Sequence, residues 1–175
     1  GQPDRRLGAG GSNGGEHRLP VPDSVSSVLQ QRLSRLPQGT QELLTLAAVI
    51  GLTFDVGLVA AVVGSPADDV LDVLESVARS GIVIEVGVDT FAFVHAIVRT
   101  ALLDGLSASR LARANRRVAA ALEARGAEQF DELARHWQLA GIESNSTKYL
   151  VKAAQRDMIA LAFESAKNRY QQVID

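Results

Sequence analysis

The chain has 175 residues, of which 46% are apolar and 22% charged, with a net charge of −2 and no cysteine. Such a composition supports one core or two small ones, gives no overall attraction to nucleic acid or to an anionic membrane, and excludes disulfides and thiolate chemistry. Aromatic residues make up only 5%, which is typical of a mostly α-helical protein packed through short side chains. No apolar stretch reaches the roughly 18 residues of a membrane span and no leader pattern opens the chain, so we expect a cytoplasmic protein without a membrane partner.

The N-terminal half is predicted to form a winged helix. Residues 1–19 are rich in glycine and poor in apolar side chains, and we interpret them as a flexible Gly-rich linker. Apolar spacing then predicts helices over residues 24–36, 39–50, 55–63 and 66–80, the last with Ser65 as its N-cap. Two β-rich runs, 82–86 and 90–94, flank a three-residue loop and predict a hairpin. Helices followed by a hairpin in this order indicate a winged-helix domain over residues 20–95.

The C-terminal half is predicted to be entirely helical. Its helices are expected over residues 95–104, 108–125, 128–140, 146–161 and 163–174, separated by Gly105-Leu106-Ser107, Gly126, Gly141 and Ser144-Asn145-Ser146. We assign residues 96–141 to a helical connector and residues 142–175 to the start of a helical-repeat region. The last two helices would form a first tetratricopeptide-like helical hairpin. Because stacked repeats bury their faces on neighbours, we expect a longer array.

A histidine stands where the second hairpin strand leads into a helix. His95 occupies this junction and Arg99 follows one helical turn later. Free N–H groups at a helix N-terminus favour anions, and a neutral imidazole there can donate one hydrogen bond to a phosphate oxygen. The alternative for His95 is a ring bonded to a backbone carbonyl at the strand–helix corner, and for Arg99 it is a salt bridge or a contact between domains. The chain contains no G-x-x-x-x-G-K-[ST] loop that could hold a nucleotide unaided.

The helix predicted over residues 108–125 has a basic face opposite its apolar stripe. It carries five arginines against one acid, Glu123. We interpret four of them as a candidate partner-binding surface: Arg110, Arg113, Arg116 and Arg117. An acidic domain and the phosphates of a nucleic acid both fit such a surface, and the alternative is an ordinary solvated face.

DNA binding through the winged helix itself is disfavoured by charge. The would-be recognition helix, residues 66–80, carries Asp68, Asp69, Asp72 and Glu75 against Arg79 alone, so a DNA groove would repel it. Metal and catalytic motifs are also missing. Glu132 and His136 supply at most two metal ligands on one helix face, and neither Ser107 nor Ser109 lies in a G-x-S-x-G setting. We therefore expect no bound metal and no enzyme active site.

Several short motifs, taken in order over about residues 19–175, resemble a known family. They are Val21-Pro22-Asp23-Ser24-Val25 with Arg32-Leu33-Ser34-Arg35-Leu36, Leu46-Ala47-Ala48-Val49-Ile50-Gly51 before Phe54-Asp55, Phe91-Ala92-Phe93-Val94-His95 with Val98-Arg99-Thr100-Ala101-Leu102, Leu106-Ser107 with Arg110, Arg116-Arg117-Val118-Ala119 with Ala121-Leu122-Glu123, and Glu132-Leu133-Ala134-Arg135-His136-Trp137. The set resembles the regulatory segment of bacterial signal-transduction ATPases with numerous domains (STAND ATPases), found in large LuxR-type transcription regulators and in actinobacterial cyclase–ATPase fusions.

The resemblance implies a function in signal transduction and transcription regulation. In that family this segment follows the ATPase core and couples its nucleotide state to helical repeats, which sense a protein or small-molecule inducer. A histidine just after the hairpin contacts the phosphates of ADP, and His95 is the matching position, with Arg99 beside it. ATP or ADP would then belong to the intact protein, with no cofactor in this segment alone. Leu103 and Asn115 depart from the pattern, in which an aromatic residue and a histidine are common. The alternatives are a DNA-binding winged helix and a plain protein-interaction scaffold.

Overall fold

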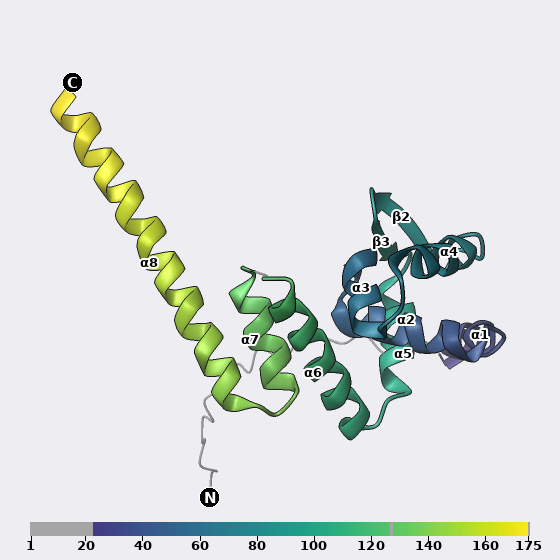
Figure 1. The fold of residues 1–175 in the computed structure, drawn as a ribbon. Helices are drawn as coiled ribbons and strands as arrows, with labels where there is room; N and C mark the ends of the chain where they lie inside the picture. The colour runs from purple at the N-terminus through teal and green to yellow at the C-terminus, as the bar shows by residue number, and fades with distance from the viewer. Residues whose placement is uncertain (1–22, 127, 175) are drawn as a thin grey trace, which may run out of the picture.

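A computed structural model describes residues 23–126 and 128–174, and the side chains of residues 29–126 and 128–159. Within this part of the chain, eight helices and three short strands follow one another (Figure 1), so the expectation of a mostly α-helical protein is confirmed. The linker predicted over residues 1–19 lies outside the described residues.

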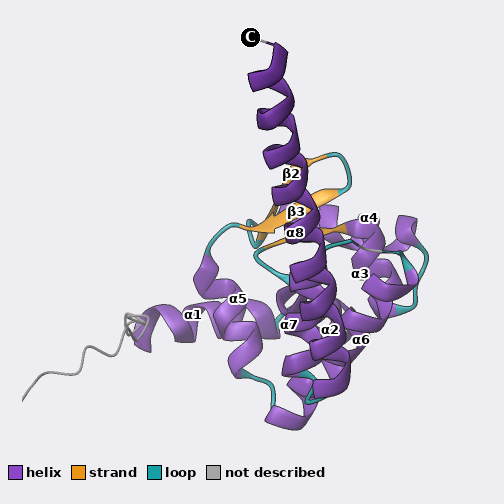
Figure 2. Ribbon diagram, turned by 90° about the vertical axis from the view of Figure 1, so that its left-hand side faces the viewer, coloured by secondary structure: helices purple, strands orange, loops and turns teal. Residues whose placement is uncertain are grey.

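The N-terminal half contains four helices and a small sheet. Its elements are α1 (Asp23–Ser34), α2 (Gln38–Ile50), β1 (Thr53–Asp55), α3 (Val56–Val63), α4 (Ala67–Ala78), β2 (Val83–Gly87) and β3 (Thr90–Phe93). The helices and the hairpin lie where apolar spacing predicts them. Strand β1 was not predicted, and it pairs antiparallel with β3 to give the sheet order β1-β3-β2. Figure 2 shows the three strands gathered in one small sheet at the edge of the helices.

The hairpin turn differs from the predicted three-residue loop. Strands β2 and β3 are joined by two residues, Val88 and Asp89, and the register slips between Glu85 and Gly87, which leaves a bulge in β2. Asp89 adopts a positive φ of 52°, a conformation that aspartate tolerates better than most residues. Its carbonyl accepts a hydrogen bond from the Val56 N–H at 2.8 Å, so the turn is tied to the start of α3.

The predicted N-cap of α4 is wrong by one residue. Pro66 occupies the cap position, and Ser65 belongs to the end of α3 instead. Gly64 closes α3 in the left-handed conformation with φ 80°, and the N–H groups of Gly64 and Ser65 both donate to the Ala60 carbonyl, at 2.7 and 3.2 Å. A glycine in this conformation is a common helix C-terminus, because the absence of Cβ removes the steric cost.

The C-terminal half consists of α5 (Ala96–Asp104), α6 (Ala108–Ala124), α7 (Phe130–Leu139) and α8 (Glu143–Ile174). The prediction of two helices over residues 146–161 and 163–174 is wrong, because α8 is one helix of 32 residues. Ser144-Asn145-Ser146 lies in its first turn and does not separate two elements. No glycine or proline follows Gly141, so nothing in the backbone stops the helix. Within the described residues 143–174, one helix therefore takes the place of the predicted tetratricopeptide-like hairpin.

Helices α6, α7 and α8 lie side by side, and α8 runs on past the end of α7 (Figure 1). Helix α2 contacts both α5 and α6, and α3 also contacts α6. The buried side chains consequently form one continuous cluster that reaches from Leu44, Leu74 and Phe91 to Val118 and Leu133. The two halves of the chain therefore share one core, in which α2 and α3 pack against α5 and α6.

Candidate functional site

His95 is an exposed residue in a firmly held backbone segment. It is the N-cap residue of α5, with φ −135° and ψ 137°. Phe93 donates from its N–H to the Leu52 carbonyl at 2.9 Å, Val94 donates to the Ile82 carbonyl at 3.2 Å, and Val98 donates to the His95 carbonyl at 3.0 Å. The backbone on both sides of the imidazole is thus fixed by hydrogen bonds while the side chain faces outward.

The His95 ring makes no hydrogen bond or ion pair with any residue of the described part, and its side chain does not cap α5. The alternative of a ring bonded to a backbone carbonyl is therefore not what the structure shows. An exposed imidazole at the N-terminus of a helix is available to a group outside this chain.

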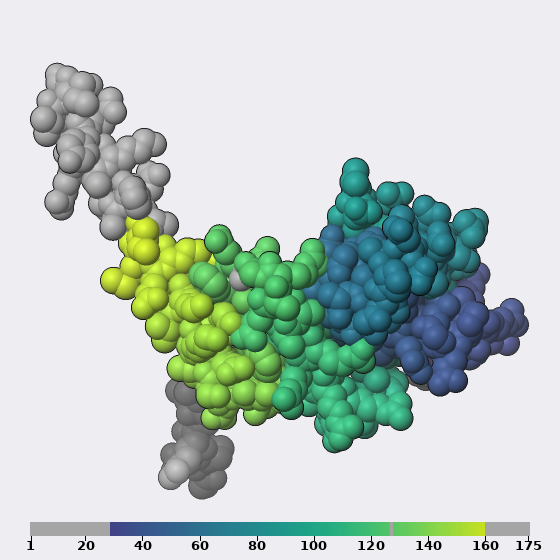
Figure 3. Space-filling model, viewed as in Figure 1, coloured from purple at the N-terminus to yellow at the C-terminus, as the bar shows by residue number. Residues whose placement is uncertain are grey.

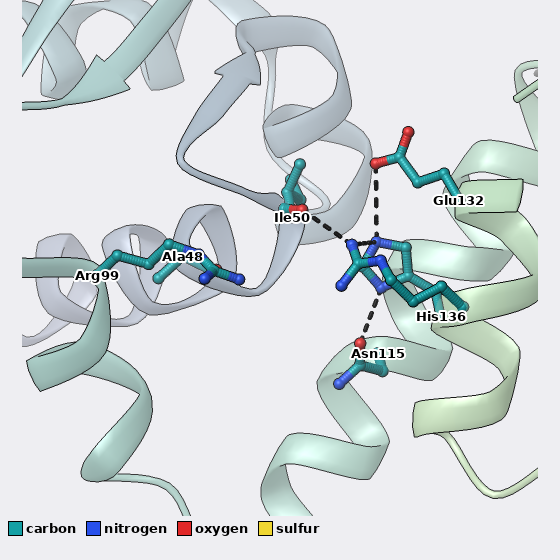
Figure 4. Close-up of polar contacts among 7 residues, drawn as sticks. Ala48, Ile50, Arg99, Asn115, Glu132 and His136 are labelled. Carbon is teal, nitrogen blue, oxygen red and sulfur yellow. Dashed lines mark hydrogen bonds and ion pairs between the residues drawn. The ribbon is translucent and has the colours of Figure 1, made fainter. Parts of the chain in front are cut away.

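Arg99 makes a contact between two helices. Its Nε donates to the Ala48 carbonyl at 2.8 Å, in the last turn of α2, and Figure 4 shows the side chain extending toward that residue. Burial lowers the pKa of Arg99, and the nearby charge of Arg135 lowers it further. The carbonyls at a helix C-terminus carry partial negative charge, so a guanidinium stabilises this end of α2. Arg99 therefore bonds within the chain, to a backbone carbonyl of α2, and its contact with a nucleotide phosphate stays a prediction.

A second arginine reaches the same end of α2 and leads into a buried polar network. Arg135 Nη2 lies 3.5 Å from the Ile50 carbonyl and 3.0 Å from His136 Nε2. His136 is fully buried, and its Nδ1 lies 2.8 Å from Asn115 Oδ1. A guanidinium can only donate, so Nε2 accepts and the ring proton lies on Nδ1, which donates to Asn115. Figure 4 shows this chain of contacts from α2 through α7 to α6.

The Glu132–His136 pair is part of this network. His136 Nε2 is 3.8 Å from Glu132 Oε1 and already accepts from Arg135. Interaction with His136 lowers the pKa of Glu132, burial opposes the shift, and the charge of Arg135 adds to the lowering. Among the described residues, no three His, Cys, Asp or Glu side chains come together in a way that could hold a metal ion.

The arginines of α6 and of its C-cap, Arg125, divide into two groups. Ser107 caps this helix by accepting from the Arg110 N–H at 3.3 Å. Arg117 Nη2 donates to the Val62 carbonyl at 2.5 Å, near the C-terminus of α3, while Arg125 forms an ion pair of 2.6 Å with Asp55, the N-cap of α3. These two side chains hold α3 at both ends.

The other three arginines of α6 are Arg110, Arg113 and Arg116, and all three are exposed. Their side chains form no ion pair with the residues whose side chains the structure describes. They remain available to an acidic partner. Arg117, by contrast, is engaged within the chain.

The acidic side chains of the predicted recognition helix lie on the surface of the protein. Asp68, Asp69, Asp72 and Glu75 of α4 are exposed, and so are Glu85 and Asp89 of the hairpin. Arg79, at the end of α4, is the only basic residue of this helix and hairpin, residues 67–93. A nucleic-acid backbone would meet negative charge on this side of the molecule.

Sequence reasoning missed the His136–Asn115 pair, although a signal for it exists. Asn115 follows Ala114 on the face of α6 that also carries Leu111, Val118 and Leu122, and it is 1% exposed. A polar residue on a buried stripe needs a partner, because an unpaired buried amide is costly. The two residues are 21 positions apart in the sequence, so the partner of Asn115 can be identified only when the packing of the helices is known.

The chain matches no protein-family model, and searches of curated proteins and of solved structures likewise return no similar protein. None of the described helices combines the length and apolarity that crossing a bilayer requires.

Proposed function

We propose that this chain is a non-catalytic regulatory module of a multidomain signal-transduction ATPase that controls transcription. It would couple the nucleotide state of an adjoining ATPase domain to a helical-repeat sensor. In this proposal the N-terminal half is a winged helix, α5 to α7 form the connector, and α8 leads toward the sensor of a protein or small-molecule inducer. ATP or ADP would be bound mainly by the adjoining domain.

The observation that carries the proposal is that the His95 side chain is exposed while three hydrogen bonds hold the backbone around it. A side chain that is presented rigidly, has no partner among the described residues and stands at a helix N-terminus suits contact with an anion on a docked domain. The order of α2, β1, α3, α4, β2 and β3 supports a winged helix, with the hairpin as its wing. Arg99 would contribute by fixing α5 against α2, as its bond to the Ala48 carbonyl suggests.

The exposed arginines of α6 support docking on an acidic surface. Arg110, Arg113 and Arg116 have no acidic partner among the described side chains, whereas Arg117 and Arg125 are used to hold α3. An adjoining domain with an acidic face would therefore meet three free guanidinium groups. Electrostatic complementarity of this kind orients a docked domain more than it strengthens binding.

The test is ADP release from the full-length protein that contains this chain. We expect His95→Ala to speed release by about two- to tenfold, the worth of one lost hydrogen bond. Gln138→Ala, which changes an exposed side chain of α7, is the control and should leave release unchanged. Unchanged release in the His95 variant would favour a plain interaction scaffold. Micromolar binding of ADP by this chain alone would contradict the placement of the nucleotide in another domain.

A second candidate function is nucleic-acid binding through α6, favoured by the same three unpaired arginines. It predicts binding to short duplexes that weakens steeply with salt and weakens further when Arg110, Arg113 and Arg116 are replaced. The exposed acids of α4 and of the hairpin argue against a role for that side of the molecule. Binding that is absent at low salt would remove this candidate.

A further inference from the structure

A groove of about 600 Å³ lies between α1, α2, α5 and α6. Its floor is apolar and includes Leu33, Leu46, Leu102 and Ala114. In Figure 3 the purple surface of α1 lies at the right-hand side of the molecule, and the green surface near the start of α6 lies at its lower edge. The volume falls within the range of roughly 300–1,000 Å³ that is usual for small-molecule sites.

One wall of the groove is strongly basic. Arg110, Arg113 and Arg117 line it from successive turns of α6, so that three positive charges share one face of the helix. The one acidic residue of the lining is Glu42, and it accepts a hydrogen bond from Gln38 at 3.1 Å. Like charges one turn apart destabilise a helix, and neither Arg110 nor Arg113 has an acidic partner among the described side chains. An anion bound between them would offset this repulsion.

The opposite wall, on α2, is polar and uncharged apart from Glu42. It includes Gln41 and Thr45, whose side chains donate to the carbonyls of Leu36 at 2.8 Å and Gln41 at 2.7 Å. These bonds hold both side chains against their own backbone, so the strongest donors left in the groove are the guanidinium groups of α6. The site thus offers an apolar floor and one cationic edge.

We propose that this groove binds a small amphipathic acid, a carboxylate with an apolar body. The carboxylate would lie between Arg110 and Arg113, which are free to bind it in bidentate geometry, and the apolar body would cover Leu46 and Leu102. The occupant would contact α1 and α2 from the N-terminal half together with α5 and α6 from the C-terminal half. Binding would therefore strengthen the association of the two halves, and it does not depend on an adjoining ATPase domain.

The test uses decanoate as the probe and decanol as its uncharged counterpart, with binding to the chain measured by titration calorimetry. We expect decanoate to bind at least about tenfold more tightly than decanol, because only the acid forms charge-assisted hydrogen bonds. The double variant Arg110→Ala/Arg113→Ala should weaken decanoate binding by about tenfold or more. Arg116→Ala is the matched control, since Arg116 is exposed on the same helix but does not line the groove, and it should leave binding unchanged.

The position of the bound acid is checked by amide chemical shifts. Decanoate should shift the amides of Leu46, Ala101 and Gly105, which line the groove, and leave those of Leu150 and Met158, exposed apolar residues of α8, unchanged. Shifts confined to α8, equal affinity for decanoate and decanol, or equal affinity in the double variant would each overturn the proposal. No detectable binding of decanoate below millimolar concentration would overturn it as well.

Discussion

Breaking the contact between Asn115 and His136 tests whether the interface of α6 and α7 depends on a buried polar pair. The perturbation is Asn115→Leu, His136→Phe and the double variant, because these substitutions keep the approximate volume while removing the polar groups. Asn115 is 1% exposed and His136 is fully buried, so water cannot replace the lost partner in either single variant. The distance of 2.8 Å between Nδ1 and Oδ1 is that of a well-formed hydrogen bond.

The expected loss of unfolding free energy depends on which group is left unpaired. In Asn115→Leu the Nδ1–H of His136 loses its acceptor, and in His136→Phe the Oδ1 of Asn115 loses its donor. A buried donor or acceptor without a partner costs about 1–3 kcal/mol, so each single variant should lose about 2 kcal/mol of unfolding free energy. The double variant removes both members of the pair and should lose about 2 kcal/mol, less than the two singles together, because the acceptor for Arg135 and the bond from Asn115 to the Leu111 carbonyl are still lost. The interaction energy of the cycle should be about 2 kcal/mol in favour of the native pair.

The assay is urea unfolding followed by fluorescence and by circular dichroism. Trp137 is the only tryptophan of the chain and is 5% exposed on α7, next to the pair, so its emission reports on this interface. In a thermal scan each single variant should melt about 4–8 °C lower, given a shift of about 2–4 °C per kcal/mol for a chain of this size. Additive single variants, with an interaction energy below about 0.5 kcal/mol, would refute the reasoning, and so would single variants of wild-type stability.

Three further predictions concern single positions. The lowered pKa of Glu132 means that its carboxylate stabilises the fold at pH values above its ordinary 4.5, so the stability advantage over Glu132→Gln should shrink as the pH falls below that value. Asp55→Ala should cost about 1 kcal/mol, because Asp55 accepts from the Leu58 N–H at 2.7 Å as the N-cap of α3, whereas Arg125→Ala should cost at most about 0.5 kcal/mol. Gly64→Ala should destabilise by about 1 kcal/mol, because φ is 80° there, and Gly39→Ala should stabilise by about 0.5 kcal/mol, because a Cβ on that residue of α2 meets nothing within 4 Å.

Each of these three predictions can be contradicted by a particular result of urea unfolding experiments. A stability difference between wild type and Glu132→Gln that is constant from pH 7 to pH 3 would remove the role assigned to its carboxylate. If Asp55→Asn were as costly as Asp55→Ala, the ion pair and not the cap would be the main contribution of that residue. Equal and small effects at Gly64 and Gly39 would contradict the left-handed conformation of Gly64.

Local signals in the sequence predicted most of the helices and the hairpin. The apolar stripe of α4 and the glycine in the turn that follows it, Gly81, are features of neighbouring residues, and helix formation depends mainly on such short-range patterns. The same reasoning failed at α8. There a break was predicted between residues 161 and 163, although the chain contains no glycine or proline after Gly141. The polar residues 144–146 were misread as a loop, although serine and asparagine are well tolerated in the first turn of a helix.

The candidate site shows the same division. That His95 follows a strand and begins a helix is visible in the sequence, because β-rich and helical periodicities meet there. That its ring is exposed while Arg99 bonds to the Ala48 carbonyl, 51 residues away, depends on how α5 lies on α2. The groove likewise requires α1, α2, α5 and α6 to be assembled before Arg110 and Arg113 share a space with Leu46.

By itself, the sequence determined a mostly helical chain, the positions of its helices and hairpin before Gly141, and a basic face on α6. Only the tertiary structure decided that β1 joins the sheet, that Arg117 and Arg125 hold the two ends of α3, and that Asn115 is the partner of His136. The physical reason is the range of the interactions. Helix periodicity and capping act over a few residues, whereas these contacts join residues 21 to 70 positions apart, whose pairing is fixed when the helices pack around a shared core.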